Sequence, residues 1–104
     1  MNTNSLLTTN MKMLVKFEDN WADEMDLVGF RIFSDTEWQE YRDKAQDIIS
    51  FNGNLTVSFG TNEENEYTEY EDFIEKFSVT AITEEQSSAI VSLFGDSYGV
   101  FPLV

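Results

Sequence analysis

The sequence contains no histidine and no cysteine among its 104 residues. Without these residues, a chain acting alone cannot form the usual structural zinc sites, use thiol redox chemistry, or catalyse by a cysteine nucleophile or a histidine acid–base pair. The sequence also lacks the glycine-rich loops of P-loop and dinucleotide-binding proteins. No apolar run approaches the ~20 residues that span a bilayer. We therefore expect a protein that is neither an enzyme nor a membrane-spanning protein, and we expect no cofactor.

Basic residues are also scarce: six Lys and Arg stand against twenty Asp and Glu, which gives a net charge of −14. A field of this sign repels nucleic acid and anionic membranes, and it attracts basic proteins and cations. The charge exceeds the magnitude of about 2 to 8 that keeps a small domain soluble. The expected partner is therefore a basic protein, for example one that binds nucleic acid, with no direct contact to nucleic acid or membrane.

The apolar content is sufficient for one folded domain. Hydrophobic residues make up 41% of the chain and include nine Phe, which can fill a core. Residues 1–10 are polar and lack the basic start and apolar centre of an export signal. We predict a flexible polar tail over 1–10, a single acidic domain over 11–104, and a cytoplasmic location; the oligomeric state stays open, and a homodimer is one alternative.

Alternation of apolar and polar residues predicts the strands. They are expected at 11–17, 27–33, 54–60 and 78–83, with a last strand left open after residue 95. An acidic connection is expected over 18–26, anchored by Trp21 and Met25. Lys12, Lys16 and Arg31 are expected to pair with carboxylates on neighbouring strands rather than to form a basic face.

Three capping boxes predict the helix starts. They are Ser34–Glu37, Thr68–Glu71 and Thr83–Gln86, and Gly95 is placed to end the last helix. The expected inward stripes are Trp38, Tyr41, Ala45 and Ile48; Tyr70, Phe73, Ile74 and Phe77; and Ala89, Ile90, Leu93 and Phe94. The order ββαβαβα, with a final β left open, predicts an α+β domain with a mostly antiparallel sheet of four to five strands and three short helices.

Two motifs match functional patterns only in part. The stretch 95–99, GDSYG, fits the hydrolase nucleophile pattern, but a helix precedes it and the chain has no histidine. Residues 19–26 are rich in carboxylates, yet Trp21 and Glu24 occupy positions 3 and 6 of an EF-hand loop, where an oxygen ligand and glycine belong. We interpret both segments as structural, and we expect neither catalytic nor metal-binding residues.

Acidic residues are the candidates for partner binding. They cluster before and within the helix expected from residue 68, along the outer ridge of the first helix, and in the 18–26 connection. The candidates are Glu63, Glu64, Glu66, Glu69, Asp72, Glu75, Glu40, Asp43, Asp47, Asp23, Glu24 and Asp26. Carboxylates about 5 to 6 Å apart on a helix approximate the phosphate spacing of a nucleic-acid strand. Tyr67, interleaved with these acids, is the aromatic residue left free to anchor a partner.

These features favour a non-catalytic acidic protein that blocks a basic site on a partner. In its sharpest form it is a DNA mimic that inhibits a nuclease, a restriction or CRISPR effector, or another DNA-binding protein. In size and charge the chain resembles phage-encoded antirestriction and anti-CRISPR inhibitors, a likeness of composition. The alternatives are an immunity protein or antitoxin that neutralises a basic toxin, a carboxylate-only enzyme or acidic domain with a weak cation site, and a domain whose acidity only keeps it soluble.

Overall fold

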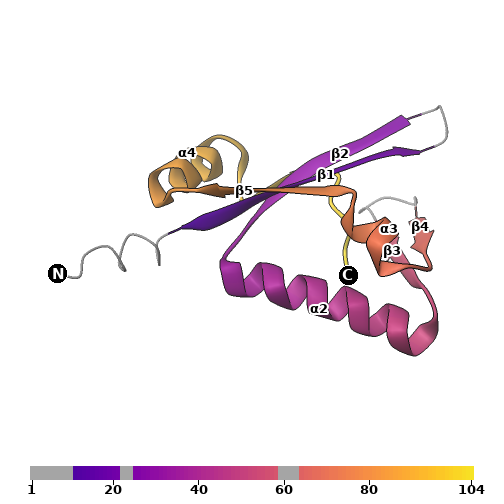
Figure 1. Cartoon of the computed structure of the whole chain (residues 1–104). Coiled ribbons are helices and arrows are strands. Elements are labelled where there is room, and N and C mark those ends of the chain that lie inside the picture. The colour runs from indigo at the N-terminus through magenta and orange to yellow at the C-terminus, as the bar shows by residue number, and fades with distance from the viewer. Residues whose placement is uncertain (1–10, 22–24, 59–63) are drawn as a thin grey trace.

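Four strands form an antiparallel sheet, and helices lie on both of its faces (Figure 1). The computed structural model describes residues 11–21, 25–58 and 64–104. The elements are β1 (Lys12–Trp21), β2 (Met25–Phe33), α2 (Asp35–Asn52), β3 (Leu55–Ser58), β4 (Glu64–Tyr67), α3 (Tyr70–Ile74), β5 (Phe77–Ile82), α4 (Glu84–Phe94) and β6 (Ser97–Gly99). The large sheet has the order β5-β1-β2-β6, and β3 pairs with β4 in a second sheet. The predicted α+β class is confirmed.

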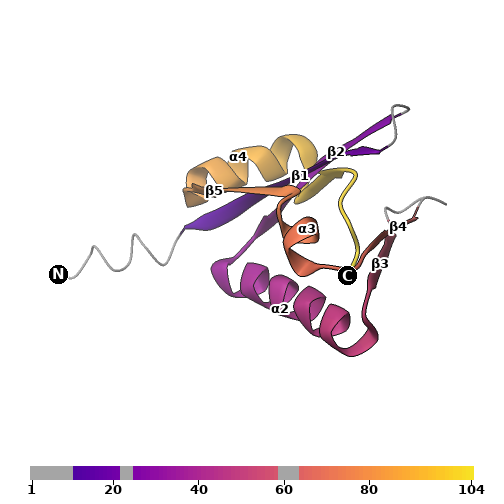
Figure 2. The ribbon, with the colours of Figure 1, turned by 45° about the vertical axis from the view of Figure 1, so that its right-hand side comes forward.

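The helices divide between the two faces of the large sheet. Helix α4 lies on one side, and α2, α3 and the two-stranded sheet lie on the other (Figures 1 and 2). The pairing register explains this arrangement because side chains directly opposite each other share a face. Val15 pairs with Val79, and Phe17 pairs with Phe77, on the α2 side. Ile82 pairs with Lys12 on the α4 side and is buried.

The hairpin of β1 and β2 is longer than the sequence predicts. Its register runs without interruption from Met13↔Phe33 to Trp21↔Met25. The predicted acidic connection over 18–26 is therefore wrong for the described residues on both sides of 22–24. Asp19, which the prediction placed in a surface loop, is 8% exposed within β1. The side chains proposed as anchors, Trp21 and Met25, lie outside the described part of the chain.

Helix α2 begins and ends as local chemistry predicts. The Ser34 hydroxyl accepts from the Glu37 amide at 3.0 Å, and a Glu37 carboxylate oxygen accepts from the Ser34 amide at 2.8 Å. The helix ends at Gly53, whose φ of 81° is the left-handed conformation that glycine adopts without steric cost. The start at Ser34 confirms the predicted capping box, and the predicted stripe of Trp38, Tyr41, Ala45 and Ile48 packs into the core.

The segment around α3 departs from the prediction. Residues 64–67 form β4, where no strand was predicted, and α3 spans only Tyr70–Ile74. The N-cap is Glu69 and makes no side-chain capping bond, so the predicted Thr68 capping box is wrong. The expected apolar residues Tyr70, Phe73, Ile74 and Phe77 do contribute to the core.

Helix α4 keeps its predicted start but not its predicted inward face. The Thr83 hydroxyl accepts from the Gln86 amide at 3.1 Å, which confirms the capping box. Ser87 is the buried residue of this helix, whereas Leu93 is 74% and Phe94 is 50% exposed. Ala89 is exposed as well. The predicted inward stripe is therefore wrong because the helix presents a different face to the sheet.

Strand β6 is the final strand that the sequence left open. It pairs with β2 over Gly29↔Gly99, Phe30↔Tyr98 and Arg31↔Ser97. A Cβ at Gly29 would collide with the main chain of Val100, so glycine is required for the close approach. The following residues return to the α2 side, where Phe101 is buried and Leu103 bridges to Ser58.

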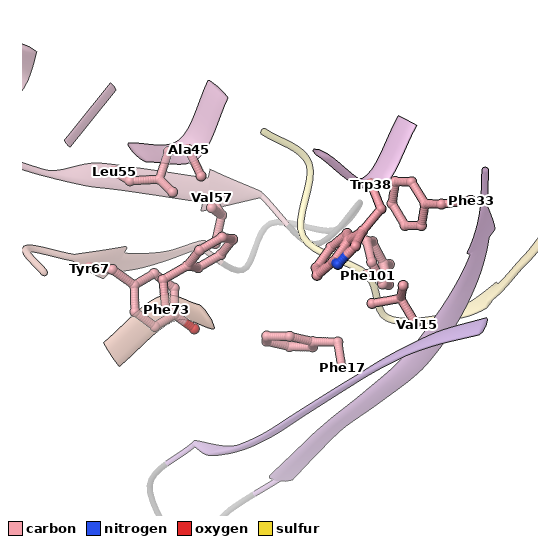
Figure 3. Close-up of a cluster of buried hydrophobic side chains, with 10 residues drawn as sticks. All are labelled: Val15, Phe17, Phe33, Trp38, Ala45, Leu55, Val57, Tyr67, Phe73 and Phe101. Carbon is pink, nitrogen blue, oxygen red and sulfur yellow. The ribbon is translucent and has the colours of Figure 1, made fainter. Parts of the chain in front are cut away.

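Aromatic rings dominate the core between the large sheet and α2 (Figure 3). The Trp38 and Tyr41 rings stack 5.5 Å apart on the inner face of α2. Phe33 and Phe101 lie against these rings from β2 and from the C-terminal segment. Phe73 extends the core to β4 through the Tyr67 ring at 5.1 Å. The core therefore joins the large sheet to the small one.

Candidate functional site

The acidic candidates that the structure describes all have exposed side chains. Eight are described: Glu40, Asp43, Asp47, Glu64, Glu66, Glu69, Asp72 and Glu75, which we call the acidic side. They are carried by α2, β4, and α3 with its two caps, elements that lie on the face of the large sheet away from α4 (Figure 2). Glu63, Asp23 and Glu24, and the side chain of Asp26, lie outside the described residues.

Strand alternation explains why Glu64 and Glu66 point outward. In β4 the side chains of Asn65 and Tyr67 face inward, so the two glutamates between them face solvent. Tyr67 is 6% exposed and fills the space beside Phe73. The interpretation of Tyr67 as a free partner anchor is therefore wrong, because its ring is part of the core.

One acid from α2 and one from α3 act electrostatically on Tyr70. Helices α2 and α3 contact each other. Burial raises the pKa of the Tyr70 hydroxyl, Arg42 lowers it, and the negative charges of Asp43 and Glu71 raise it. Because Asp43 comes from α2 and Glu71 from α3, the two acidic helices are close enough for their charges to act on one phenol.

Bases offset little of this charge. Within the described ranges, Glu75 is the one member of the acidic side that forms an ion pair, with Lys76 at 3.9 Å. Lys44, one turn after Glu40 on α2, does not pair with that carboxylate; its ammonium donates to the main-chain oxygen of Val104 at 2.8 Å. Residues 35–76 contain twelve acids and three bases, a net charge of −9 out of −14.

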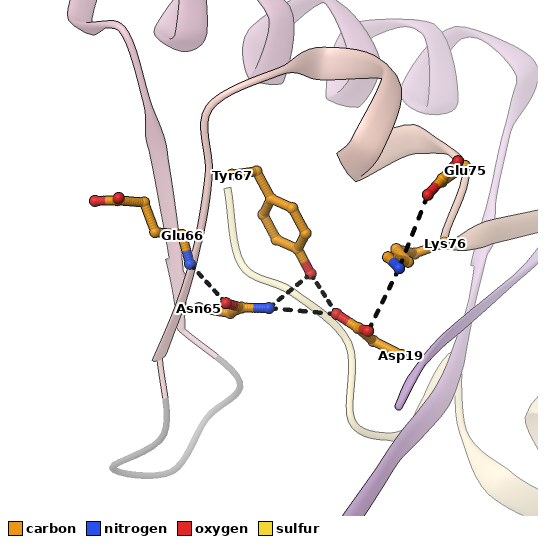
Figure 4. A network of polar contacts seen from close by, with 6 residues as sticks. All are labelled: Asp19, Asn65, Glu66, Tyr67, Glu75 and Lys76. Carbon is orange, nitrogen blue, oxygen red and sulfur yellow. Dashed lines mark hydrogen bonds and ion pairs between the residues drawn. The ribbon is translucent and has the colours of Figure 1, made fainter. Parts of the chain in front are cut away.

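A polar network fastens the small sheet, and hence Glu64 and Glu66, to the large sheet (Figure 4). The Tyr67 hydroxyl donates to the Asp19 carboxylate at 2.8 Å, and the Asn65 amide donates to the same oxygen at 3.3 Å. The Lys76 ammonium lies 3.6 Å from the other Asp19 oxygen. A carboxylate predicted as a surface residue therefore links β1, β4 and the start of β5.

The buried Tyr67 hydroxyl should lower the free energy of unfolding at alkaline pH. Burial raises its pKa, and both the hydrogen bond to Asp19 and the charge of that carboxylate raise it further. As pH rises through about 10, tyrosines of the unfolded chain ionise while Tyr67 in the folded chain stays neutral, so the free energy of unfolding falls. Urea midpoints measured between about pH 8 and about pH 11 should fall less for Tyr67→Phe than for the original chain. Identical losses would contradict this assignment.

An exposed aromatic patch on the α4 side was not predicted from the sequence. The rings of Phe30, Phe94 and Tyr98 contact one another at 5.2 to 6.1 Å between centroids. Phe94 and Tyr98 are half-exposed, and Leu93, the residue before Phe94 on α4, is also exposed. The one available signal was the surplus of apolar residues near the end of α4, which the prediction assigned to the core.

The three basic residues of the large sheet do not form a common basic face. Lys16 lies 3.8 Å from Glu18 on its own strand. The Arg31 guanidinium lies over the Phe33 ring, 4.8 Å from its centroid. Arg31 pairs with Val15 and Lys16 pairs with Phe30, so the two bases belong to opposite faces. The prediction that these bases pair with carboxylates on neighbouring strands is therefore wrong for Lys16 and Arg31.

Neither a metal site nor a membrane span emerges from the described residues. Over 11–21, 25–58 and 64–104, no group of three or more acidic side chains is arranged to hold a metal ion. No helix in these ranges is long and apolar enough to cross a bilayer.

The fold and surface define a small α+β domain with an acidic side and an apolar patch on opposite sides of one sheet. No protein-family model, curated protein or solved structure matches this chain.

Proposed function

We propose that this protein is a non-catalytic acidic binding protein whose acidic side occupies a basic site on a protein partner. The observation that carries the proposal is the concentration of exposed carboxylates on α2, β4 and α3, with Glu75 alone forming an ion pair among the described members. An uncompensated group of like charges repels itself, so it weakens the folded chain unless a partner or counterions neutralise it. A basic partner would gain both fast association and charge complementarity.

The sharper form of the proposal is mimicry of a nucleic-acid backbone. Glu40, Asp43 and Asp47 follow i, i+3 and i+7 spacing along α2, which places neighbouring carboxylates about 5 to 6 Å apart at Cβ. Asp43 on α2 and Glu71 on α3 both raise the pKa of the Tyr70 hydroxyl, so negative charge extends from one helix to the next. A partner groove that binds phosphates would meet a comparable row of negative charge here.

Two matched variants test which side of the molecule binds. The first carries Glu40→Gln, Asp43→Asn, Glu69→Gln and Asp72→Asn, all on the acidic side. The control carries Glu18→Gln, Glu84→Gln, Glu85→Gln and Asp96→Asn, which are exposed acids elsewhere. Both variants lose four negative charges, so they differ only in where the charge is removed.

Immobilised protein is used to capture partners from a bacterial lysate depleted of nucleic acid. We expect DNA-binding proteins to be recovered by the original chain and by the control, and recovery by the acidic-side variant to fall at least about tenfold, or ~1.4 kcal/mol. Capture should also weaken as salt is raised, because exposed charges are screened. Equal losses in the two variants would show that net charge alone governs capture and would contradict the proposal.

A further inference from the structure

Within the part of the chain that the structure describes, strand β5 is an uncharged edge on a strongly acidic protein. It forms one end of the sheet order β5-β1-β2-β6, and its sequence FSVTAI contains no charged residue. Ser78, Val79, Thr80 and Ala81 are all exposed. Edge strands of monomeric proteins are commonly protected by lysine, proline, a bulge or short length. The opposite edge, β6, has three residues, whereas β5 has six and none of these protecting side chains.

The hydrogen-bond pattern shows which main-chain groups of β5 face outward. The Glu18 amide donates to the Lys76 carbonyl at 2.9 Å, one step before the β1–β5 register begins at Phe17↔Phe77. In an antiparallel ladder the hydrogen-bonded pairs alternate, so Ser78, Thr80 and Ile82 bond to β1. The N–H and C=O groups of Phe77, Val79 and Ala81 therefore point away from the sheet.

We infer that two copies of this chain pair through antiparallel β5 strands, with a twofold axis at Val79. In that register Val79 meets Val79 of the second copy, and each Phe77 meets an Ala81, so a large side chain lies opposite a small one. About six main-chain hydrogen bonds would form, because each directly opposed outward pair exchanges two. The pairing is self-complementary, as a closed twofold interface requires.

The lack of charged residues on β5 favours a second copy of this chain over a basic protein as the partner at this edge. A basic protein would be attracted to the acidic side, whereas two chains of net charge −14 can approach most easily where neither carries charge. Extending the register places Lys76 opposite Ile82 and Glu75 opposite Thr83, so no carboxylate directly faces another across the paired strands. The half-exposed Val79 side chains would cover each other at the axis.

Sedimentation equilibrium tests the pairing and its salt dependence together. The mass should approach twice the 12.0 kDa of one chain at about 1 mM protein. Raising salt from about 0.01 M to about 1 M, which shortens the Debye length from ~30 Å to ~3 Å, should strengthen the dimer. The acidic-side binding proposed above should weaken over the same range, so failure of one proposal is distinguishable from failure of the other.

Val79 and Val91 have nearly the same exposed fraction, so substitutions at these positions form a matched test and control. Val79 on β5 is 45% exposed and Val91 on α4 is 43% exposed. Val79→Lys would place two ammonium groups at the axis, and we expect at least about a tenfold loss of dimer affinity. Val91→Lys makes the same charge change away from the edge and should dimerise like the original chain. Leu93→Lys tests the aromatic patch as the alternative contact.

Amide hydrogen exchange of the unmodified chain gives an independent readout that needs no variant. The amides of Phe77, Val79 and Ala81 should become protected as protein concentration rises, while those of Ser78 and Thr80 are protected at every concentration. A monomer at about 1 mM protein and about 1 M salt would overturn the inference. So would dimerisation that is lost in Leu93→Lys but retained in Val79→Lys.

Discussion

Replacing Phe73 with alanine is expected to remove about 3 to 5 kcal/mol of the free energy of unfolding. Phe73 is fully buried, and its ring contacts those of Tyr67 and Phe77 at 5.1 and 5.0 Å. The substitution leaves a cavity where α2, β4 and β5 meet. A domain of this size has a total stability of about 5 to 15 kcal/mol, so a large fraction of it would be lost.

Urea unfolding followed by tryptophan fluorescence measures this loss. The matched control is Phe51→Ala on α2, because Phe51 is 88% exposed and should change stability by less than about 0.5 kcal/mol. The midpoint should fall for Phe73→Ala with little change in the slope against urea. Similar midpoints for the two variants would contradict the position of Phe73 in the core.

Replacing Asp19 with alanine is expected to cost about 2 to 3 kcal/mol, although it removes an acid from a strongly acidic chain. The carboxylate accepts from Tyr67 and Asn65 and lies beside Lys76. Its loss leaves the buried Tyr67 hydroxyl without the acceptor to which it now donates. The control Glu18→Ala removes the neighbouring exposed carboxylate and should change stability by less than about 0.5 kcal/mol.

A double-mutant cycle isolates the contact between Asp19 and Tyr67. The single variants Asp19→Ala and Tyr67→Phe and the double variant are unfolded in urea at neutral pH. We expect the double variant to be more stable than the sum of the single losses predicts, by about 0.5 to 3 kcal/mol. Additive losses would show that the two groups do not interact, and the attachment of β4 to β1 would need another explanation.

Local chemistry predicted the starts of α2 and α4 and the buried face of α2. The Ser34 and Thr83 boxes both form, and α2 buries Trp38 and Ala45 as expected. These features depend on residues three or four positions apart, so the sequence shows them directly. The Thr68 box has the same spacing but does not form, because residues 64–67 are drawn into pairing with β3.

Long-range contacts account for most of the failures. Strand β4 reads ENEY, a composition with little strand preference, and its stability depends on Tyr67 reaching Asp19 from 48 positions away. The same contact explains why β1 continues through an acidic stretch that resembles a loop. Periodicity in α4 identified apolar residues but not which of them face the sheet, so Leu93 was assigned to the core.

For the candidate site, the sequence predicted which acids are exposed more successfully than how they are arranged. All eight described members of the acidic side are exposed as expected. Their distribution over α2, β4 and α3 on one side of the sheet depends on tertiary packing, which residue spacing does not reveal. Tyr67 was predicted incorrectly. Its position among acidic residues suggested an exposed side chain, but its ring is buried in the core.

Competition with duplex DNA tests the central claim most directly. A DNA-binding protein captured by this chain is mixed with labelled duplex, and release of the duplex is followed by fluorescence anisotropy. The original chain and the Glu18, Glu84, Glu85 and Asp96 control should displace the DNA competitively, while the Glu40, Asp43, Glu69 and Asp72 variant should need at least about ten times more protein. A complex that holds DNA and this protein together, or equal displacement by both variants, would contradict the claim that the acidic side blocks a basic site.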